Sequence, residues 1–151
     1  MPHQPLNPYT PKFLTLEITE TAILQDSNSI ISNVELLKRA GVMLSLDDYG
    51  TGYSSLKYLK EFNFDEIKID KTFIQELARS ERNLKLTDAC ISLGHSLGAV
   101  VVAEGVEDEQ TAELLRAHGC DVLQGFGISR PLPLDEFRKF AEAVQTGTQE
   151  R

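Results

Sequence analysis

The segment VMLSLDDYGTGY, residues 42–53, decides how the rest of the chain is interpreted. It starts with a short apolar run at 42–46, continues with Asp47 and Asp48, and ends in a glycine-containing loop. A run of four to eight apolar residues bounded by turn residues is typical of a buried β-strand. Successive strand residues point to opposite faces, so both aspartates can serve one site only where the strand breaks. We expect the two glycines of the loop to supply that break.

The same pattern of a short strand followed by a helix recurs on both sides of this segment. Further strands are predicted at 14–18, 67–70, 100–103 and 122–124, and helices at 29–40, 54–60, 82–97, 108–118 and after residue 133. Alternating strands and helices predict βαβ units and a parallel sheet, here an α/β fold of about five units. The strands are apolar nearly throughout, which predicts that both faces of the sheet are covered. In the 82–97 helix, the packed face is predicted to consist of Leu86, Cys90, Leu93 and Leu97.

The length of the chain limits which α/β fold it can form. It has 151 residues, whereas an eight-unit (β/α) barrel typically takes about 250. The sequence therefore predicts either a small open α/β sheet or the C-terminal part of a barrel. Four of the six prolines lie in the first eleven residues, so we expect residues 1–12 to be an extended lead-in. Residues 145–151 are expected to be a polar tail.

Composition and charge exclude several classes of protein. A chain with 41% hydrophobic and 25% charged residues is typical of a globular protein and not of a disordered one. The net charge of −8 and the pI near 4.9 argue against bulk nucleic acid as a partner. Two cysteines, Cys90 and Cys120, are too few for a disulfide scaffold. With no apolar run of membrane-spanning length and no visible signal peptide, the expected location is the cytoplasm.

Acidic residues follow the predicted strands, and their position indicates a metal site. Glu17, Asp47 with Asp48, and Glu104 each lie at or near the end of a strand, and Lys68 and Gln124 lie in two others. The C-terminal ends of parallel strands meet on one side of the sheet, which is where α/β proteins place their active sites. Clustered carboxylates repel each other unless a cation is present, and oxygen ligands favour Mg²⁺, Mn²⁺ or Ca²⁺ over Zn²⁺. His3, His95 and His118 are isolated and offer no competing ligand pair.

Each of these residues also has a purely structural interpretation. An acid directly after a strand is often the N-cap of the next helix, and Asp70 fits this role well enough to be left out of the predicted ligands. Lys68 is costly to bury without a partner, so it forms either a structural ion pair or a contact with the acidic cluster. The glycine loop matches neither a P-loop nor a dinucleotide fingerprint, which leaves a tight turn. Arg130 fits a phosphate contact or a solvated surface charge.

Five motifs in order then resemble one family, the EAL-domain cyclic-di-GMP phosphodiesterases. The matching strings are LEITE at 16–20, DDYGTGYSSL at 47–56, IKID at 67–70, AEGVE at 103–107, and QGF at 124–126 with PLP at 131–133. They cover residues 13 to about 140, and we expect residues 13–144 to form a partial EAL domain. The resemblance implies the C-terminal part of a TIM-like (β/α) barrel in which one strand runs antiparallel. It also implies hydrolysis of cyclic di-GMP to linear pGpG with Mg²⁺ or Mn²⁺ in a two-metal site.

The resemblance further implies a role for each matching residue. Glu17, Asp47, Asp48 and Glu104 would be metal ligands, and Asp47 would be shared by both ions. Lys68 would position or help deprotonate the attacking water, Gln124 would support that water, and Glu104 would act in catalysis as well as in binding. Glu20 would hold the 47–56 loop, and Glu107 would contact that loop or the substrate. Arg130 lies outside the matching strings, and its positive charge suggests support of the substrate.

The chain also departs from the family pattern. Tyr49 stands where the family usually has Phe, and neither the Glu-Ala-Leu segment nor the Asn-bearing strand, which supply further ligands, is present. We therefore expect the isolated chain to be weakly active or inactive and to self-associate through its open sheet edges. Upstream sensory or diguanylate-cyclase-type domains are expected in the parent protein. The alternative is a non-catalytic module that binds cyclic di-GMP or a protein. A third hypothesis, a small dinucleotide-binding domain, is disfavoured because the sequence lacks the glycine fingerprint of such domains.

Overall fold

The chain forms one parallel five-stranded sheet. The computed structural model describes residues 11–25, 27–50, 59 and 62–146. Its strands are β1 (Thr15–Thr19), β2 (Met43–Tyr49), β3 (Glu66–Ile69), β4 (Val100–Glu104) and β5 (Val122–Gln124). They are paired in sequence order, all in parallel, so β1 and β5 are the two edges of an open sheet. This confirms the predicted parallel α/β fold with its five strands.

Helices follow the strands at most of the predicted places. They are η1 (Pro11–Phe13, 3₁₀), α1 (Glu20–Gln25), α2 (Ser27–Arg39), α4 (Lys71–Ile74), η2 (Leu77–Arg79, 3₁₀), α5 (Glu81–Ser96), α6 (Glu109–Ala117) and α7 (Leu134–Thr146). The six-residue α1 was not predicted, because so short a helix has too few turns for its apolar residues to recur. The helix predicted at 54–60 lies outside the described residues except for Leu59. Helix α7 extends to Thr146, one residue beyond the position at which the polar tail was predicted to start.

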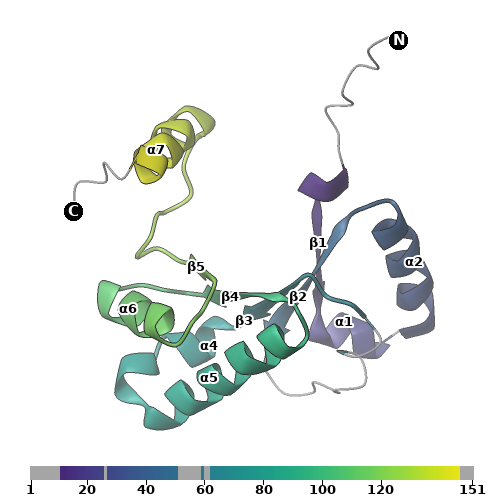
Figure 1. The fold of residues 1–151 in the computed structure, drawn as a ribbon, viewed down its shortest axis with the longest axis horizontal. Helices are drawn as coiled ribbons and strands as arrows, with labels where there is room; N and C mark the ends of the chain where they lie inside the picture. The colour runs from purple at the N-terminus through teal and green to yellow at the C-terminus, as the bar shows by residue number, and fades with distance from the viewer. Residues whose placement is uncertain (1–10, 26, 51–58, 60–61, 147–151) are drawn as a thin grey trace.

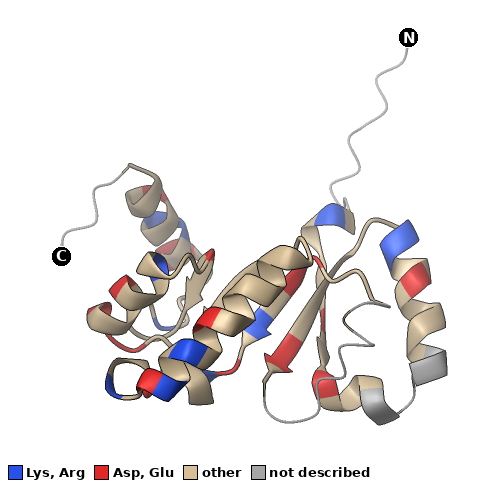
Figure 2. Cartoon of the chain, turned by 60° about the horizontal axis from the view of Figure 1, so that its bottom comes forward, with Lys and Arg blue, Asp and Glu red and all other residues tan. Residues whose placement is uncertain are grey.

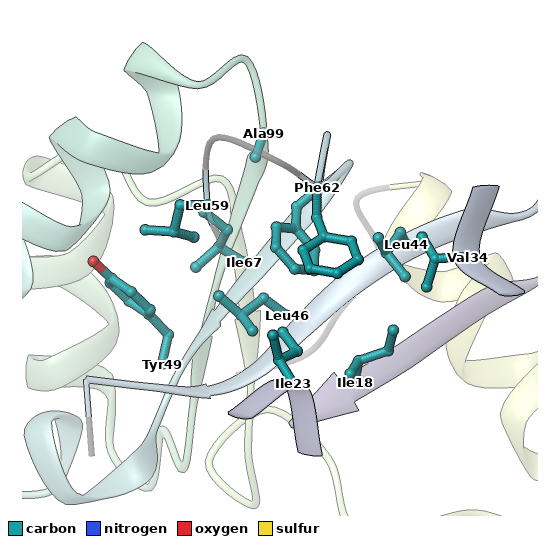
Figure 3. Packing of buried hydrophobic residues seen from close by; sticks show 11 residues of the cluster. Ile18, Ile23, Val34, Leu44, Leu46, Tyr49, Leu59, Phe62, Ile67 and Ala99 are labelled. Carbon is teal, nitrogen blue, oxygen red and sulfur yellow. The ribbon is translucent and has the colours of Figure 1, made fainter. Parts of the chain in front are cut away.

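The two faces of the sheet are packed differently, although central residues are buried on both of them, as Ser45, Lys68 and Val102 show for the second face. Leu44, Leu46, Ile67 and their neighbours in register point to one face, where they pack with Ile23 of α1 and Val34 of α2 (Figure 3). The same face continues through β3 and β4, which pack with α4, α5 and α6. The alternate residues of the strands point to the other face, where Met43, Val100 and Val122 are between 36% and 43% exposed. Strands alternate, so an apolar sequence does not by itself show that a helix covers each face.

Helix α5 packs on the sheet only partly through the predicted stripe. Cys90 and Leu93 pack against the core as predicted, but Leu86 and Leu97 are 40% and 42% exposed. The most buried residues of the helix are Thr87, Ile91 and Gly94. A Cβ atom at Gly94 would lie 2.4 Å from Cγ2 of Val101, so the missing side chain lets the helix approach β4 closely, which hydrophobicity alone does not reveal.

The last helix, α7, stands apart from the other helices, at the end of an extended segment that leaves β5 (Figure 1). None of its residues is buried, and Leu134, Phe137 and Val144 are each at least half exposed. Acidic and basic residues are interspersed over the helices, and acidic residues also mark the strands (Figure 2). Among the described residues, no helix has the length and apolar character needed to cross a membrane.

Candidate active site

A bulge in β2 brings the two aspartates opposite Lys68. Leu46 pairs with Ile67 and Tyr49 pairs with Ile69, so two residues of β2, Asp47 and Asp48, face the single residue Lys68 of β3. Asp48 has a φ of +58°, the left-handed conformation that allows the extra residue to be accommodated. The strand is thus already irregular at Asp48, before it ends at Tyr49 next to Gly50; Gly52 lies outside the described residues. Bulges of this kind often redirect side chains next to active sites.

Three carboxylates from three strand ends converge on the ammonium group of Lys68. Its Nζ lies 2.7 Å from Oε1 of Glu104, 3.0 Å from Oε1 of Glu17 and 3.3 Å from Oδ1 of Asp47. We call these four residues the carboxylate cluster. The side chain of Lys68 is only 7% exposed, whereas that of Glu17 is 52% exposed. All four residues lie on the face of the sheet opposite to the helix-packed core, as their registers require.

The surroundings of Lys68 keep it protonated. Burial alone would lower the pKa of this amine, but hydrogen bonds to Glu104 and Glu17 and the negative charges of Glu104 and Asp47 outweigh burial. The pKa of Lys68 is therefore raised above its ordinary value. In this geometry Lys68 is a hydrogen-bond donor and a fixed positive charge. Both interpretations left open by the sequence hold at once, because the ion pair of the buried lysine is made with the acidic cluster.

The cluster also contains polar atoms that are not satisfied. Oδ1 of Asp47 is near enough to Lys68 for an ion pair but is not aligned for a hydrogen bond, and it has no other partner within the described part of the chain. The hydroxyl of Ser45, two residues earlier on the same face, is fully buried and likewise without a described partner. Sequence analysis missed Ser45, although its alternation with Met43 and Asp47 along β2 could have indicated it.

The donor set suits a hard divalent cation, but the carboxylates are held by an ammonium. Carboxylate oxygens and a buried, unsatisfied oxygen of Asp47 are the chemistry that Mg²⁺ and Mn²⁺ prefer. Within the described residues, however, no three His, Cys, Asp or Glu side chains are grouped so as to hold a metal by themselves. The residues therefore fit a metal ion by type, with Lys68 at the centre of the arrangement.

The other predicted site residues lie around this cluster and not within it. Gln124 is the register neighbour of Glu104 on β5 and shares its face. Oε1 of Glu107 accepts a hydrogen bond of 3.1 Å from Nε2 of Gln75. The guanidinium of Arg130 lies 4.7 Å from the centre of the Phe126 ring, where it makes a cation–π contact.

Glu20 is buried at the start of α1, 7% exposed, and neither of its carboxylate oxygens has a hydrogen-bond partner within the described residues. Residues 51–56 of the loop that the resemblance assigns to it lie outside those residues. Nearby, burial raises the pKa of Tyr49 to about 12, and the charges of Cys90 and Glu20 contribute. The hydroxyl of Tyr49 points away from the apolar cluster (Figure 3).

Two structural expectations are confirmed. Asp70 caps α4, because its Oδ1 accepts a hydrogen bond of 2.9 Å from the backbone N–H of Thr72. His95 and His118 lie on the surface of α5 and at the end of α6, each 2.9 Å from an aspartate oxygen and away from the carboxylate cluster. Neither histidine is part of the candidate site.

Comparison with known proteins shows the family. The family model for the EAL domain matches residues 6–131. The chain is 43% identical over 133 residues to "Cyclic di-GMP phosphodiesterase NbdA" of Pseudomonas aeruginosa, covering 88% of this chain and 17% of that protein. It thus spans less than a fifth of the length of this relative.

Solved structures agree in fold. The "PaMucR Phosphodiesterase, c-di-GMP complex" superimposes with a TM-score of 0.80 at 43% identity, over 85% of this chain and 52% of that one. A manganese and cyclic di-GMP complex of Klebsiella pneumoniae BlrP1 gives 0.76 at 33% identity, over 80% and 31%. The open sheet thus corresponds to part of a TIM-barrel-like domain. The chain belongs to the EAL domain family.

Proposed function

We propose that this chain carries the larger part of the catalytic site of a divalent-metal-dependent phosphodiesterase that hydrolyses cyclic di-GMP to linear pGpG. The observation that carries this proposal is the convergence of Glu17, Asp47 and Glu104, from three neighbouring strands, around Lys68. The relatives named above, one a cyclic di-GMP phosphodiesterase and two solved with cyclic di-GMP, support the choice of substrate.

The proposed metal ligands are Glu17, Asp47, Asp48 and Glu104, and the proposed ion is Mg²⁺ or Mn²⁺. When bound, such an ion lowers the pKa of a coordinated water and neutralises phosphate charge. The bulge at Asp48 allows adjacent aspartates to contribute to one site, which a regular strand would not allow. The manganese complex of BlrP1 supports the type of ion.

The remaining residues are proposed to act on water and phosphate. Lys68, a protonated donor, orients the attacking water and offers positive charge to a phosphate oxygen. Gln124, next to Glu104 in register, supports that water. Glu20 is proposed to hold the loop after β2, and Glu107 and Arg130 to support that loop and the substrate.

The test is hydrolysis of cyclic di-GMP in the presence of Mn²⁺, followed by chromatography of the product. It should be run on this chain and on a complete EAL domain that contains it. We expect pGpG from the complete domain and little or none from the chain, because the chain spans only 52% of the PaMucR structure. An Asp47→Asn complete domain is the control. A complete domain that binds cyclic di-GMP without cleaving it at any Mn²⁺ or Mg²⁺ concentration would contradict the proposal.

A second candidate is a non-catalytic module that binds cyclic di-GMP or a partner protein. It is favoured by one observation: in the described residues the carboxylates surround Lys68 and no metal-binding group of three is formed. Titration calorimetry with cyclic di-GMP separates the two candidates. Binding without turnover by the complete domain supports this second one.

The surroundings of the chain in a cell are also proposed. The chain spans 17% of NbdA, so we propose that sensory or diguanylate-cyclase-type domains accompany it. We also propose that it acts in the cytoplasm. The two open edges of the sheet, β1 and β5, support self-association of the isolated chain. We further propose that residues 13–144 form the folded EAL portion, with 1–12 as a lead-in, in which the family match already begins at residue 6, and 145–151 as a tail.

A further inference from the structure

Two glycines let the loop after β5 lie directly against the loop after β4. A Cβ atom on Gly125 would lie 2.2 Å from the oxygen and 2.4 Å from the nitrogen of Val106. A Cβ atom on Gly127 would lie 2.6 Å from the carbonyl carbon of Glu107. Real Cβ atoms do not approach backbone atoms so closely, so any side chain at these positions would force the two loops apart.

Hydrogen bonds join the same two loops. The N–H of Val106 donates to the oxygen of Gln124 over 3.1 Å, and the N–H of Gly127 donates to the oxygen of Val106 over 2.9 Å. Val106 itself is fully buried. This contact therefore extends the β4–β5 pairing beyond Glu104 and Gln124, the last residues that the two strands pair in register.

The loop after β4 is equally confined on its other side, where β3 lies. Gly105 has a φ of +71°, and a Cβ atom there would lie 2.5 Å from Cβ of Lys71. The loop is thus held between the residues that follow β3 and those that follow β5. Glu104 immediately precedes this confined segment, and its carboxylate makes the shortest contact with Lys68, 2.7 Å. A displaced Val106 has little room to move without carrying Glu104 with it.

We propose that Gly125 is a positioning residue for the candidate site: by admitting the backbone of Val106 at contact distance, it fixes the end of β4 so that Glu104 meets Lys68. The role of that contact in catalysis rests on the proposed function, but the geometric claim does not. Gly127 acts less directly: its N–H also donates to Val106, but a Cβ atom there would meet Glu107, which bonds to Gln75 and not to the cluster.

The test uses NMR spectroscopy of the whole chain, without metal or substrate, so that failure of the proposed function leaves it intact. The readout is the ¹⁵N–¹H resonance of the Lys68 ammonium, whose hydrogens exchange slowly with water only while they are buried and bonded. We expect Gly125→Ala to accelerate this exchange at least tenfold or to abolish the resonance. Gly127→Ala, whose Cβ meets Glu107 and not Val106, should accelerate the exchange less than Gly125→Ala does and should also shift the side-chain amide of Gln75.

Gly98→Ala is the matched control. Gly98 has a φ of +76°, but a Cβ atom there would meet nothing within 4 Å, so this variant loses stability through backbone strain alone. If Gly98→Ala accelerates exchange at Lys68 as much as Gly125→Ala does at an equal loss of melting temperature, the proposal is wrong. An unchanged Lys68 resonance in a folded Gly125→Ala protein overturns it as well.

A measurement on the unsubstituted chain covers the case in which Gly125→Ala does not fold. If the Val106 contact holds Glu104 in place, the N–H of Val106 must be protected at least as strongly as the Lys68 ammonium, because opening the first releases the second. A Val106 N–H that exchanges freely while the Lys68 ammonium stays protected would refute the proposal. Absence of any protected Lys68 resonance would refute it too, because the contact to be positioned would not exist in solution.

Discussion

Replacing Lys68 with Met tests whether this one cation holds the candidate site together. Methionine keeps an unbranched apolar stem of similar length, so the packing of the side chain is largely preserved while the charge is removed. In the Lys68→Met protein, three carboxylates would lose the ammonium that lies 2.7 to 3.3 Å from them. The variant should therefore be less stable, and it should respond differently to a divalent cation.

The magnitude follows from burial. Removing one partner of a buried ion pair costs about 3–5 kcal/mol, because the other partner is left with an uncompensated charge. Here the carboxylates left behind are partly in water, Glu17 being 52% exposed and Glu104 20%. Solvent therefore screens part of the repulsion, and we expect a loss of about 2 kcal/mol in the free energy of unfolding. For a chain of this size that corresponds to roughly 4–8 °C in melting temperature.

The pH dependence of this loss has a definite sign. The pKa of Lys68 is raised in the folded chain, so its contribution is fully present below the pKa of an unfolded lysine, about 10.4. It is lost only as the pH rises through the still higher folded value. The gap in melting temperature between the Lys68→Met protein and the unsubstituted chain should therefore be constant from pH 6 to pH 9.

The assay is thermal unfolding with and without Mn²⁺. Once the ammonium is gone, the carboxylates should bind the cation more tightly, so Mn²⁺ should stabilise the variant more than the unsubstituted chain. Lys85→Met is the control, because Lys85 forms an exposed pair with Glu81 at the similar distance of 2.7 Å and should cost less than about 0.5 kcal/mol. Equal stabilisation of both proteins by Mn²⁺, or a Lys68→Met protein as stable as the unsubstituted chain, would refute this reasoning.

Three further predictions concern the ligands, the core and the edges. In a complete domain, Asp47→Asn should abolish turnover because it weakens the ligand that we propose two ions share, and Asp48→Asn should be milder; normal initial rates of the Asp47→Asn domain at limiting Mn²⁺ would contradict this. Gly94→Ala should lower the free energy of unfolding in urea by about 1–3 kcal/mol, because the added Cβ would lie 2.4 Å from Val101, even though Ala favours a helix more than Gly does. Ser92→Ala, at an exposed position of the same helix, is the control and should leave the free energy of unfolding unchanged. The isolated chain should scatter light as a dimer or larger species, because β1 and β5 are unpaired edges; a stable monomer at micromolar concentration would count against it.

The fold was predictable because its pattern is repeated. Each strand is short and largely apolar and alternates with helical segments, so errors at one boundary do not change the topology. The five strands were placed within three residues at each end. What the sequence could not show is which stripe of α5 packs, because the close approach at Gly94 depends on the shape of β4 and not on hydrophobicity.

The sequence predicted which acidic residues form the candidate site, but it did not predict that Lys68 lies at the centre of them. Parallel strands bring their C-terminal ends together, so Glu17, Asp47 and Glu104 could be grouped from their positions alone. The bulge at Asp48 could not be foreseen, because it depends on a register shift between β2 and β3 and on a left-handed residue that is not glycine. The same shift sets Lys68 opposite both aspartates, which makes the lysine the common neighbour of the acids.

The charge of the carboxylate cluster links its fold to its proposed chemistry. One ammonium and three carboxylates leave a formal excess of two negative charges on adjacent strands of the sheet. Lys68 thus offsets part of the repulsion between the three carboxylates, which allows the strands to pair, but the cluster keeps a net negative charge. The four residues of the carboxylate cluster come from β1 to β4, which are consecutive in the sheet. The cluster therefore forms without the strands that would close a barrel. The charge that remains would be balanced by the divalent cations of the proposed site, for which the unsatisfied Oδ1 of Asp47 is a candidate oxygen ligand. The carboxylates are thus already gathered around Lys68 without a metal ion.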